Sequence, residues 1–139
     1  MHTISYLFFN GNCAKAIEFY KSTMGAKVSG LMLNKDAPDA AARMPGSDDL
    51  VMNAMLNIGD TAIMASDAPA NLYQKPQGFR LYVEVDSAPE ADRIFAALSD
   101  GGETTMPIDK VFWAERFGMV DDKFGTPWMV SFTGNVMQS

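Results

Sequence analysis

The spacing of hydrophobic and polar residues predicts strands and helices in a regular order along the chain. Residues Thr3 to Phe9 (TISYLFF) are β-branched and aromatic, which favours a strand. Apolar residues then recur at helical spacing between Asn12, a plausible N-cap, and Gly25, a plausible C-terminal glycine. Gly59-Asp60 reads as the turn of a hairpin. Further strands are predicted over 26–34, 50–58 and 61–66.

The same order returns after a proline-containing connector. Phe79 to Asp86 (FRLYVEVD) predicts a strand, and Ser87 is placed to cap a helix that ends at the glycines 101 and 102. The remaining strands are predicted over 103–109 (ETTMPID), 111–121 (VFWAERFGMVD) and 126–134 (TPWMVSFTG).

The two halves are therefore an internal repeat, and an offset of 76 residues pairs Tyr6 with Tyr82. Each half alone is a sheet with one face covered by one helix, so its other face needs a partner. We predict one α+β domain over residues 1–139, built from two βαβββ repeats (about 1–68 and 78–135). Their strands are expected to form a curved eight-stranded mixed sheet with a concave pocket.

Composition narrows the classes of function. The 139 residues are 47% apolar and 20% charged, as in ordinary globular proteins. The net charge of -6 is spread along the chain, so nucleic acid is not expected as a partner. No apolar run approaches the ~18 residues needed to span a bilayer, and no signal-peptide pattern is present, so we expect no membrane partner and a cytoplasmic location. One cysteine and one histidine exclude a four-ligand Cys/His zinc cluster within one chain.

Three segments resemble the PhnB-like branch of the vicinal oxygen chelate superfamily, which includes glyoxalase I, bleomycin-resistance proteins and extradiol dioxygenases. They are YLFFNGNCAKAIEFY (6–20), IMASDA (63–68) and VFWAERFGMVDDKFGTPWMV (111–130). The resemblance covers nearly the whole chain. It implies a homodimer whose ligand pocket is the concave face of the sheet.

In the metal-dependent relatives, four side chains, mostly His or Glu, enter the concavity from the first and last strand of each half. By resemblance these positions fall on Ser5, Ile63, Arg80 and Met129. None is a good metal ligand, and Arg80 would repel a cation, so we expect neither a metal nor a cofactor. Members of this branch are sometimes called demethylubiquinone methyltransferases, but this sequence lacks the Gly-rich loop of a Rossmann unit, and we do not expect that activity.

The strand 79–86 supplies the first candidate ligand residues. Alternation puts Arg80, Tyr82 and Glu84 on one face and apolar residues on the other, which is expected under the helix. A guanidinium fork, a phenol and a carboxylate could position a small anionic or hydroxylated ligand. The alternative interpretation is an ion pair that stabilises an exposed sheet face.

The stretch FWAERFG supplies two more candidates, Trp113 and Glu115, which alternation places on one face with Phe117. A desolvated carboxylate among aromatic rings would have a raised pKa and would suit a general base. The alternative is a surface glutamate beside aromatics at a dimer contact. The predicted ligand-binding residues are thus Arg80, Tyr82, Glu84, Trp113 and Glu115, and no catalytic residue is assigned.

Other reactive residues have simpler interpretations. Cys13 lies at a helix start, where the pKa of a thiol can be lowered, so it could be a reactive thiolate. No histidine is near in sequence to act as its base, and we favour the interpretation that Cys13 is a small buried side chain that fills space in the core. His2 is interpreted as solvated, and Asp121 and Asp122 as turn-formers. The strand methionines are expected mainly in the core: Met52, Met55, Met64, Met119 and Met129.

Three functions are compatible with this sequence. The first is a metal-free protein that binds a small molecule. The second is a metal-dependent lyase or dioxygenase of the glyoxalase type, with ligands among Glu84, Glu115, Asp67 and His2. The third is a bleomycin-resistance-type protein that sequesters its ligand without turnover. The Ala, Pro and Gly content of the long loop Lys35 to Asp49 permits a lid over the site without requiring one.

Overall fold

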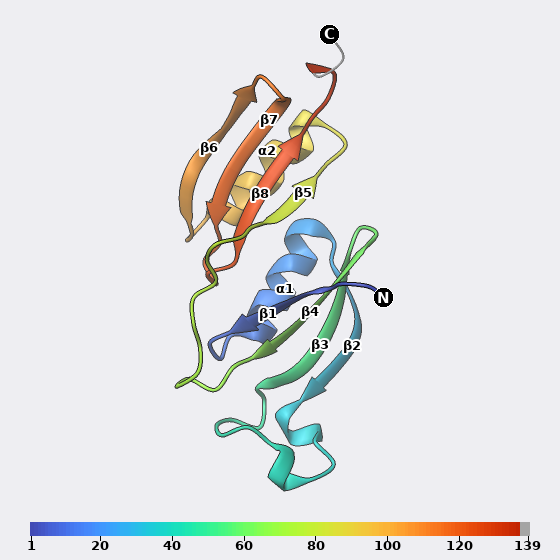
Figure 1. Cartoon of the computed structure of the whole chain (residues 1–139), viewed down its shortest axis with the longest axis vertical. Helices are drawn as coiled ribbons and strands as arrows, with labels where there is room; N and C mark the ends of the chain where they lie inside the picture. The colour runs from blue at the N-terminus through green and yellow to red at the C-terminus, as the bar shows by residue number, and fades with distance from the viewer. Residues whose placement is uncertain (137–139) are drawn as a thin grey trace. The chain divides into compact units, whose positions relative to one another are not determined.

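The computed structural model describes residues 1–136 and divides into two compact units, Met1–Gln74 and Lys75–Ser139 (Figure 1). The first contains β1 (Ser5–Phe9), α1 (Cys13–Met24), β2 (Lys27–Leu33), the short 3-10 turns η1 (Asn34–Asp36) and η2 (Ala40–Ala42), β3 (Val51–Ile58) and β4 (Thr61–Asp67). The second contains β5 (Leu81–Glu84), α2 (Ala88–Ser99), β6 (Glu103–Val111), β7 (Ala114–Asp121) and β8 (Pro127–Phe132). Both units follow the predicted βαβββ order.

The two sheets have the same topology. The strand order is β1-β4-β3-β2 in the first and β5-β8-β7-β6 in the second. In each, the first and last strands of the repeat are parallel neighbours and the other pairs are antiparallel. The α+β class and the two βαβββ repeats are therefore confirmed. Each repeat forms its own four-stranded mixed sheet, and a single eight-stranded sheet with a shared pocket stays a prediction.

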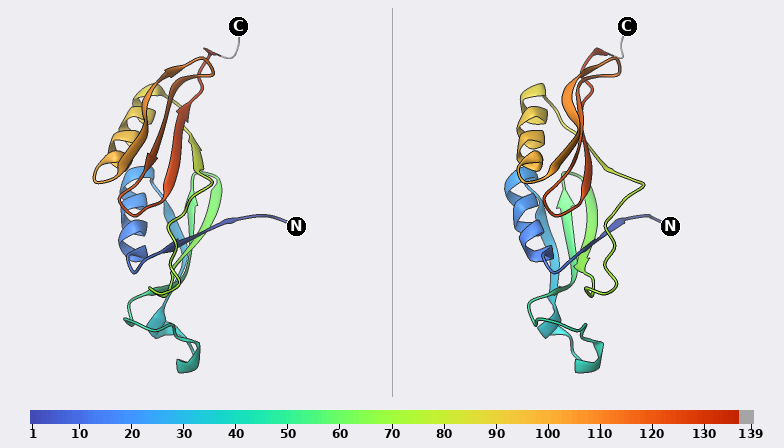
Figure 2. Two further views of the ribbon diagram at one scale, coloured as in Figure 1. Left: turned by 60° about the vertical axis from the view of Figure 1, so that its left-hand side comes forward. Right: turned by 90° about the vertical axis from the view of Figure 1, so that its left-hand side faces the viewer.

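One helix covers one face of each sheet (Figure 2). The buried side of the first sheet is made by β-strand residues such as Leu7, Phe9 and Leu56, which face apolar residues of α1 such as Ile17 and Tyr20. Burial of these side chains at period 2 in strands and 3.6 in the helix is what the hydrophobic pattern predicts. The opposite side of each sheet, called here the open face, is left uncovered by the helix of its own repeat.

The start of α1 is fixed by a side chain distant in sequence. The buried carboxylate of Asp67, at the end of β4, accepts hydrogen bonds from the backbone N–H of Cys13 and of Val51, both at 2.9 Å. Asn12 is the N-cap residue, as predicted, but its side chain makes no capping hydrogen bond, and the carboxylate of Asp67 takes that role. Gly25 ends the helix as predicted, with a left-handed φ of 67° that favours glycine.

In the second repeat the helix start is set by a residue adjacent in sequence, as predicted. Ser87 caps α2 by accepting a hydrogen bond from the backbone N–H of Glu90 at 3.2 Å, as predicted. Gly118 on β7 allows α2 to approach closely, because a Cβ there would lie 2.7 Å from a ring carbon of Phe95. Trp128 on β8 is 1% exposed and completes this core.

The predicted strand over 111–121 is two elements instead of one. Val111 ends β6, Ala114 begins β7, and these two residues are paired, so Phe112 and Trp113 form a two-residue turn. Aromatic residues favour strands, and no Gly, Asn or Asp marks this turn, so the pattern alone predicted a continuous strand. Phe112 is 84% exposed as a result.

Among the helices within residues 1–136, none has the length and apolar character required to cross a membrane.

Candidate functional site

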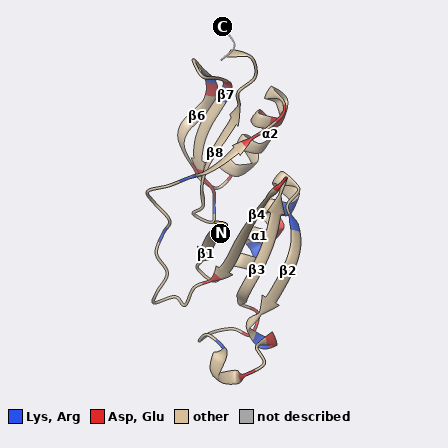
Figure 3. Cartoon of the chain, turned by 45° about the vertical axis from the view of Figure 1, so that its right-hand side comes forward, with Lys and Arg blue, Asp and Glu red and all other residues tan. Residues whose placement is uncertain are grey.

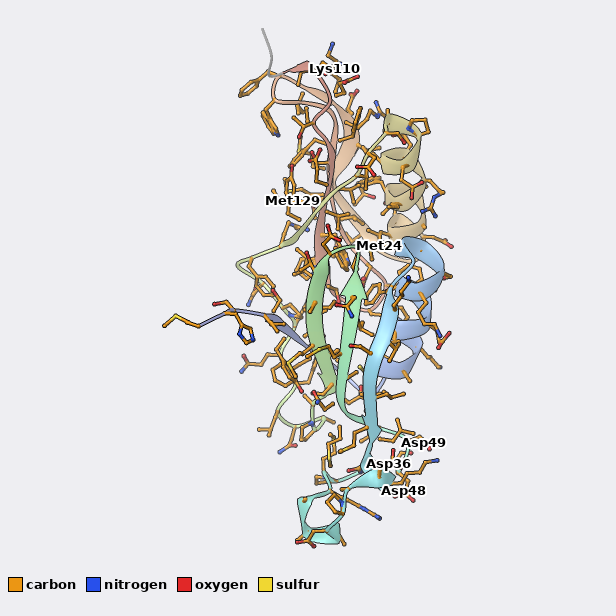
Figure 4. All side chains as sticks on the ribbon, turned by 90° about the vertical axis from the view of Figure 1, so that its right-hand side faces the viewer. Met24, Asp36, Asp48, Asp49, Lys110 and Met129 are labelled. Atoms are coloured by element: carbon orange, nitrogen blue, oxygen red, sulfur yellow. The ribbon has the colours of Figure 1, made fainter. Side chains whose placement is uncertain are left out.

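The open face of the second sheet carries a row of half-exposed side chains. Tyr82 on β5 is the strand partner of Met129 on β8, and Met129 is the partner of Met119 on β7. The residues on either side of Met129 along β8 are buried, so Met129 points away from α2 (Figure 4). Tyr82 is 53% exposed. The row offers flexible thioethers beside a phenol, a surface that can adapt to an apolar ligand.

The first repeat has the same row on its own open face, where Tyr6 is the partner of Met64 and Met64 is the partner of Met55. The expectation that the strand methionines lie mainly in the core is therefore wrong. Alternation gives the helix-facing positions to their buried neighbours, such as Leu56, Ala65 and Val130, and Met55, Met64, Met119 and Met129 fall on the other side. None of the five is fully buried: Met52, Met55, Met64, Met119 and Met129.

A hollow of about 330 Å³ lies at one end of the row in the second repeat. It is lined by residues 75–80 of the connector together with Asp121 and Pro127. Asp121 and Pro127 are strand partners, and each lies two positions along its strand from a methionine of the row. Since residues two apart share a face, the hollow continues the open face.

Arg80 is the best-anchored cation of this hollow. Its Nη1 donates to Asp121 Oδ1 at 2.9 Å and to the carbonyl oxygens of Val120 and Trp128, both at 3.3 Å. All three bonds use one nitrogen, so Nε and Nη2 have no partner among the described residues, and the side chain is 23% exposed. Lys75 Nζ lies 3.9 Å from Asp121 Oδ2. Two cations against one carboxylate make the hollow attractive to an anion.

Glu84 is satisfied by donors of its own chain. Tyr82 Oη donates to Oε1 at 2.9 Å, while the backbone N–H and the hydroxyl of Thr133 donate at 2.7 and 3.0 Å. Partial burial acts to raise the pKa of Glu84, but the bonds from the Thr133 backbone and from Tyr82 outweigh it and leave the pKa below its ordinary value. The carboxylate thus ties β5 to the segment that follows β8, and a ligand contact at Glu84 stays a prediction.

Trp113 lies in the turn before β7 and Glu115 is the second residue of β7, whereas Asp121 lies at its end. The Trp113 ring packs against Phe117 with centroids 5.3 Å apart. Glu115 Oε2 accepts a hydrogen bond from the backbone N–H of Asn135 at 3.0 Å. Neither Trp113 nor Glu115 lines the hollow at Arg80, so the structure divides the five predicted ligand residues between two ends of the open face.

Cys13 is a buried filler, as favoured by the sequence. Its side chain is 0% exposed, and burial, followed by the negative charge of Asp67, raises the pKa of Cys13 to about 12. A position at a helix start can lower the pKa of a thiol, but at Cys13 burial and Asp67 outweigh that effect. The alternative hypothesis, that Cys13 is a reactive thiolate, is therefore wrong.

The two adjacent aspartates diverge. Asp122 is a turn-former, as predicted, and its buried carboxylate accepts hydrogen bonds from Phe124 N at 2.8 Å, Thr126 N at 3.1 Å and Trp128 Nε1 at 2.9 Å. Asp121 is the last residue of β7 and belongs to the ion pair in the hollow, so the turn interpretation is wrong for it. Strand alternation, which places Asp121 on the face of Met119, is the sequence signal that would have revealed it.

The residue types at the superfamily's metal positions do not fit a metal ion. Ser5 and Ile63 are partners on β1 and β4, Met129 is a thioether, and Arg80 is a cation in an ion pair. Within residues 1–136, no three His, Cys, Asp or Glu side chains gather closely enough to hold an ion. Of the alternative ligands, Asp67 is committed to two backbone N–H groups, Glu84 and Glu115 accept bonds from backbone N–H groups, and His2 is exposed.

The fold and the open-face rows define a protein built from two βαβββ repeats, and comparison with known proteins supplies its family. The model of the family described as 3-demethylubiquinone-9 3-methyltransferase matches residues 1–131, and the chain belongs to this family. It is 37% identical to protein YjdN of Escherichia coli over 91% of both chains.

Two solved structures have the same fold over nearly all of both chains. Protein PA1353 from Pseudomonas aeruginosa is 39% identical, with a TM-score of 0.84 and coverage of 95% of this chain and 97% of that one. A PhnB protein from Bacillus cereus, titled a putative 3-demethylubiquinone-9 3-methyltransferase, is 23% identical, with a TM-score of 0.81 and coverage of 95% and 99%. These matches confirm the resemblance to the PhnB-like branch of the vicinal oxygen chelate superfamily.

The described residues do not fit the nucleotide-type methyl donor that the family's description suggests. Such donors bind at a Gly-rich loop that opens onto a free helix N-terminus. In residues 1–136, the loops before α1 and α2 are short (10–12 and 85–87), with one glycine between them. The start of α1 is already occupied by the carboxylate of Asp67, and that of α2 by the hydroxyl of Ser87. We therefore derive no methyl-transfer step.

Proposed function

We propose that this chain binds a small organic anion on the open face of its second repeat, with the anionic group at Arg80 and the apolar part over the row of Tyr82, Met129 and Met119. The observation that carries the proposal is the state of Arg80. Its guanidinium is fixed by three hydrogen bonds through Nη1, borders the hollow, and keeps Nε and Nη2 for a ligand.

A fixed guanidinium suits a carboxylate, phosphate or phosphonate group. These groups accept two parallel hydrogen bonds from the planar fork of arginine. Because Arg80 is held in place before the ligand arrives, little side-chain entropy is lost on binding. Lys75 adds a second positive charge whose side chain is 60% exposed and can move toward the ligand.

The size and lining of the hollow favour a ligand with a small apolar body. A volume of about 330 Å³ is at the lower end of the range for small-molecule sites. Phe79 borders it and is 50% exposed, and the Tyr82 ring is close along the same strand. A ring or short alkyl group attached to the anionic group would therefore remove apolar surface from water.

The proposal is tested by titration calorimetry with phenylphosphonate and benzoate, with benzyl alcohol as the uncharged control. The double variant Arg80→Gln/Asp121→Asn removes both charges of the pair while keeping polar side chains. We expect it to raise the Kd of both anions at least about tenfold, as is typical for loss of hydrogen bonds to a charged group. The matched control is Arg93→Gln/Glu90→Gln, which removes an exposed Arg–Glu pair on α2 and should change nothing.

A second arm uses Asp121→Asn alone. Loss of the carboxylate makes the hollow more positive, so the two anions should bind several-fold more tightly while benzyl alcohol is unaffected. Unchanged anion binding in both Arg80 and Asp121 variants, or an equal loss in the α2 control, would show that the anion does not bind here. Analysis of the recovered ligand separates simple binding from turnover.

A further inference from the structure

The methionines of this chain lie outside its core. The buried apolar side chains are aliphatic or aromatic, apart from Cys13, and no methionine within residues 1–136 is among them. Flexible thioethers commonly fill gaps in protein interiors, so a chain that keeps them at partly exposed positions departs from the usual use of methionine. Small solutes can therefore reach methionine side chains while the protein stays folded.

Three of these methionines are neighbours on the open face of the second repeat. Met129 on β8 pairs with Met119 on β7, and Met119 pairs in turn with Met106 on β6. Side chains paired in this way share a face and start about 5 Å apart. The strand β8 itself has no charged residue (Figure 3). The row that begins at Tyr82 thus continues to a third thioether, whereas the equivalent row of the first repeat ends on β2 at Gly30.

An oxidant that approaches the folded chain meets these thioethers and not the single thiol. The Cys13 side chain is 0% exposed, and burial, followed by the negative charge of Asp67, raises the pKa of Cys13 to about 12. A peroxide reacts with a thiolate, which Cys13 does not form at neutral pH. A thioether has no proton to lose, so accessibility alone decides whether it reacts.

We propose that Met106, Met119 and Met129 form an oxidation site at which hydrogen peroxide lowers the affinity of the open face for apolar groups. In each reaction the thioether sulfur attacks one oxygen of the peroxide, an S–O bond forms, the O–O bond breaks, and the other oxygen leaves as water. The sulfur loses two electrons and the peroxide gains them. A dithiol reductant reverses the change: it supplies two electrons and two protons, becomes a disulfide, and the sulfoxide oxygen leaves as water.

The position of these methionines decides what their oxidation does. A sulfoxide is polar, and inside a core it disrupts packing. The core under α2 is made instead by the buried neighbours of Met129 along β8, which are Trp128 and Val130. On the open face, the apolar part of a ligand would lie against sulfoxide oxygens that retain water, so less apolar surface would be removed from water on binding. Oxidation should therefore weaken binding and leave the fold intact.

The inference rests on the proposed ligand site, and its test distinguishes the two. The full chain is treated with hydrogen peroxide, and mass spectrometry of its peptides identifies the oxidised methionines. Calorimetry then compares phenylphosphonate with inorganic phosphate, which has no apolar part. We expect the Kd of phenylphosphonate to rise at least about fivefold and that of phosphate to stay the same. Methionine sulfoxide reductases with dithiothreitol should restore the original Kd, and the midpoint of urea denaturation should not change.

Leucine variants assign the effect to particular side chains, because leucine is apolar, similar in size to methionine and resistant to peroxide. In Met106→Leu/Met119→Leu/Met129→Leu, peroxide should no longer change the Kd of phenylphosphonate. The matched control is Met55→Leu/Met64→Leu in the first repeat, in which peroxide should raise the Kd by the same factor as in the wild type.

Four results would overturn the oxidation site alone: phenylphosphonate binding that is equally tight before and after peroxide, an equal loss for phosphate, a loss that persists in the triple variant, or a lower urea midpoint after oxidation. Absence of phenylphosphonate binding before any oxidation is a different failure. It would overturn the proposed function, and the effect of oxidation on binding with it.

Discussion

The two repeats share an apolar surface but differ in charge. Both open faces carry a Tyr–Met–Met row, formed by Tyr6, Met64 and Met55 in the first and by Tyr82, Met129 and Met119 in the second. Two positions along the strands, the first repeat has the paired residues Asn57 and Ala62, whereas the second has Asp121 and Pro127 with Arg80 bound to the aspartate.

This comparison shows which features come with the duplicated fold and which are particular to the second repeat. The row of flexible side chains comes with the duplicated fold and can accommodate apolar groups in either repeat. A fixed guanidinium with an adjacent hollow is present in the second repeat, and it gives that surface a preference for anions.

The largest expected effect concerns the buried aspartates that stabilise the two repeats in different ways. Asp67 joins the start of α1 to β3 in the first repeat, and Asp122 holds the β7–β8 turn and Trp128 in the second. Replacement of either by Ala leaves buried N–H groups unsatisfied and should lower the free energy of unfolding by about 2–3 kcal/mol. Urea denaturation measures this loss, and a change below ~0.5 kcal/mol in either variant would contradict the assigned role.

A smaller effect is expected at alkaline pH and comes from the first repeat, which holds the single cysteine. The pKa of Cys13 is raised to about 12 in the folded chain, so the folded state keeps the proton longer than the unfolded state. Stability should be full below the unfolded thiol pKa of about 8.5 and should decline above it by at most about 1.4 kcal/mol per pH unit.

Denaturation curves between pH 8 and 10.5 measure this decline. The Cys13→Ala variant lacks the titrating group, so its stability should fall less steeply than that of the wild type over the same range. Parallel curves for the two proteins would mean that the thiol ionises as readily in the folded chain as in the unfolded one.

The smallest effect belongs to Glu84 in the second repeat. Its pKa is lowered, so the stability it contributes is present above the unfolded glutamate pKa of about 4.3 and is lost as pH falls through the lowered value. Because the side chain is exposed, solvent screening keeps the contribution small. Glu84→Gln should flatten the acid limb of the stability profile slightly, and an unchanged limb would show that the bonds from Thr133 carry no net energy.

Features that depend on near neighbours in sequence could be predicted. The repeat order, the Ser87 cap, the Gly25 helix end and the Gly59-Asp60 hairpin all follow from residues a few positions apart. The family was also recognisable, because its characteristic segments are continuous stretches of the chain. Alternation correctly placed Arg80 and Tyr82 on the face away from Leu81.

Features that depend on distant partners could not be predicted. Arg80 and Asp121 are separated by 41 positions, and the cap of α1 comes from Asp67, 54 positions from Cys13. Such contacts require the strand register, which single-sequence patterns do not supply. The turn at Phe112 and Trp113 was missed for a different reason, since its residues have the composition of a strand.

The most direct test of the central claim, that the second repeat holds the ligand site, uses the methionines of the two equivalent rows as reporters. In protein labelled with ¹³C at the methionine methyl groups, phenylphosphonate is added and the signals are followed by NMR. Met119 and Met129 should shift in a saturable manner while Met55 and Met64 stay in place, and the shifts should be lost in Arg80→Gln/Asp121→Asn. Saturable shifts confined to Met55 and Met64, or shifts that persist in the double variant, would contradict the account.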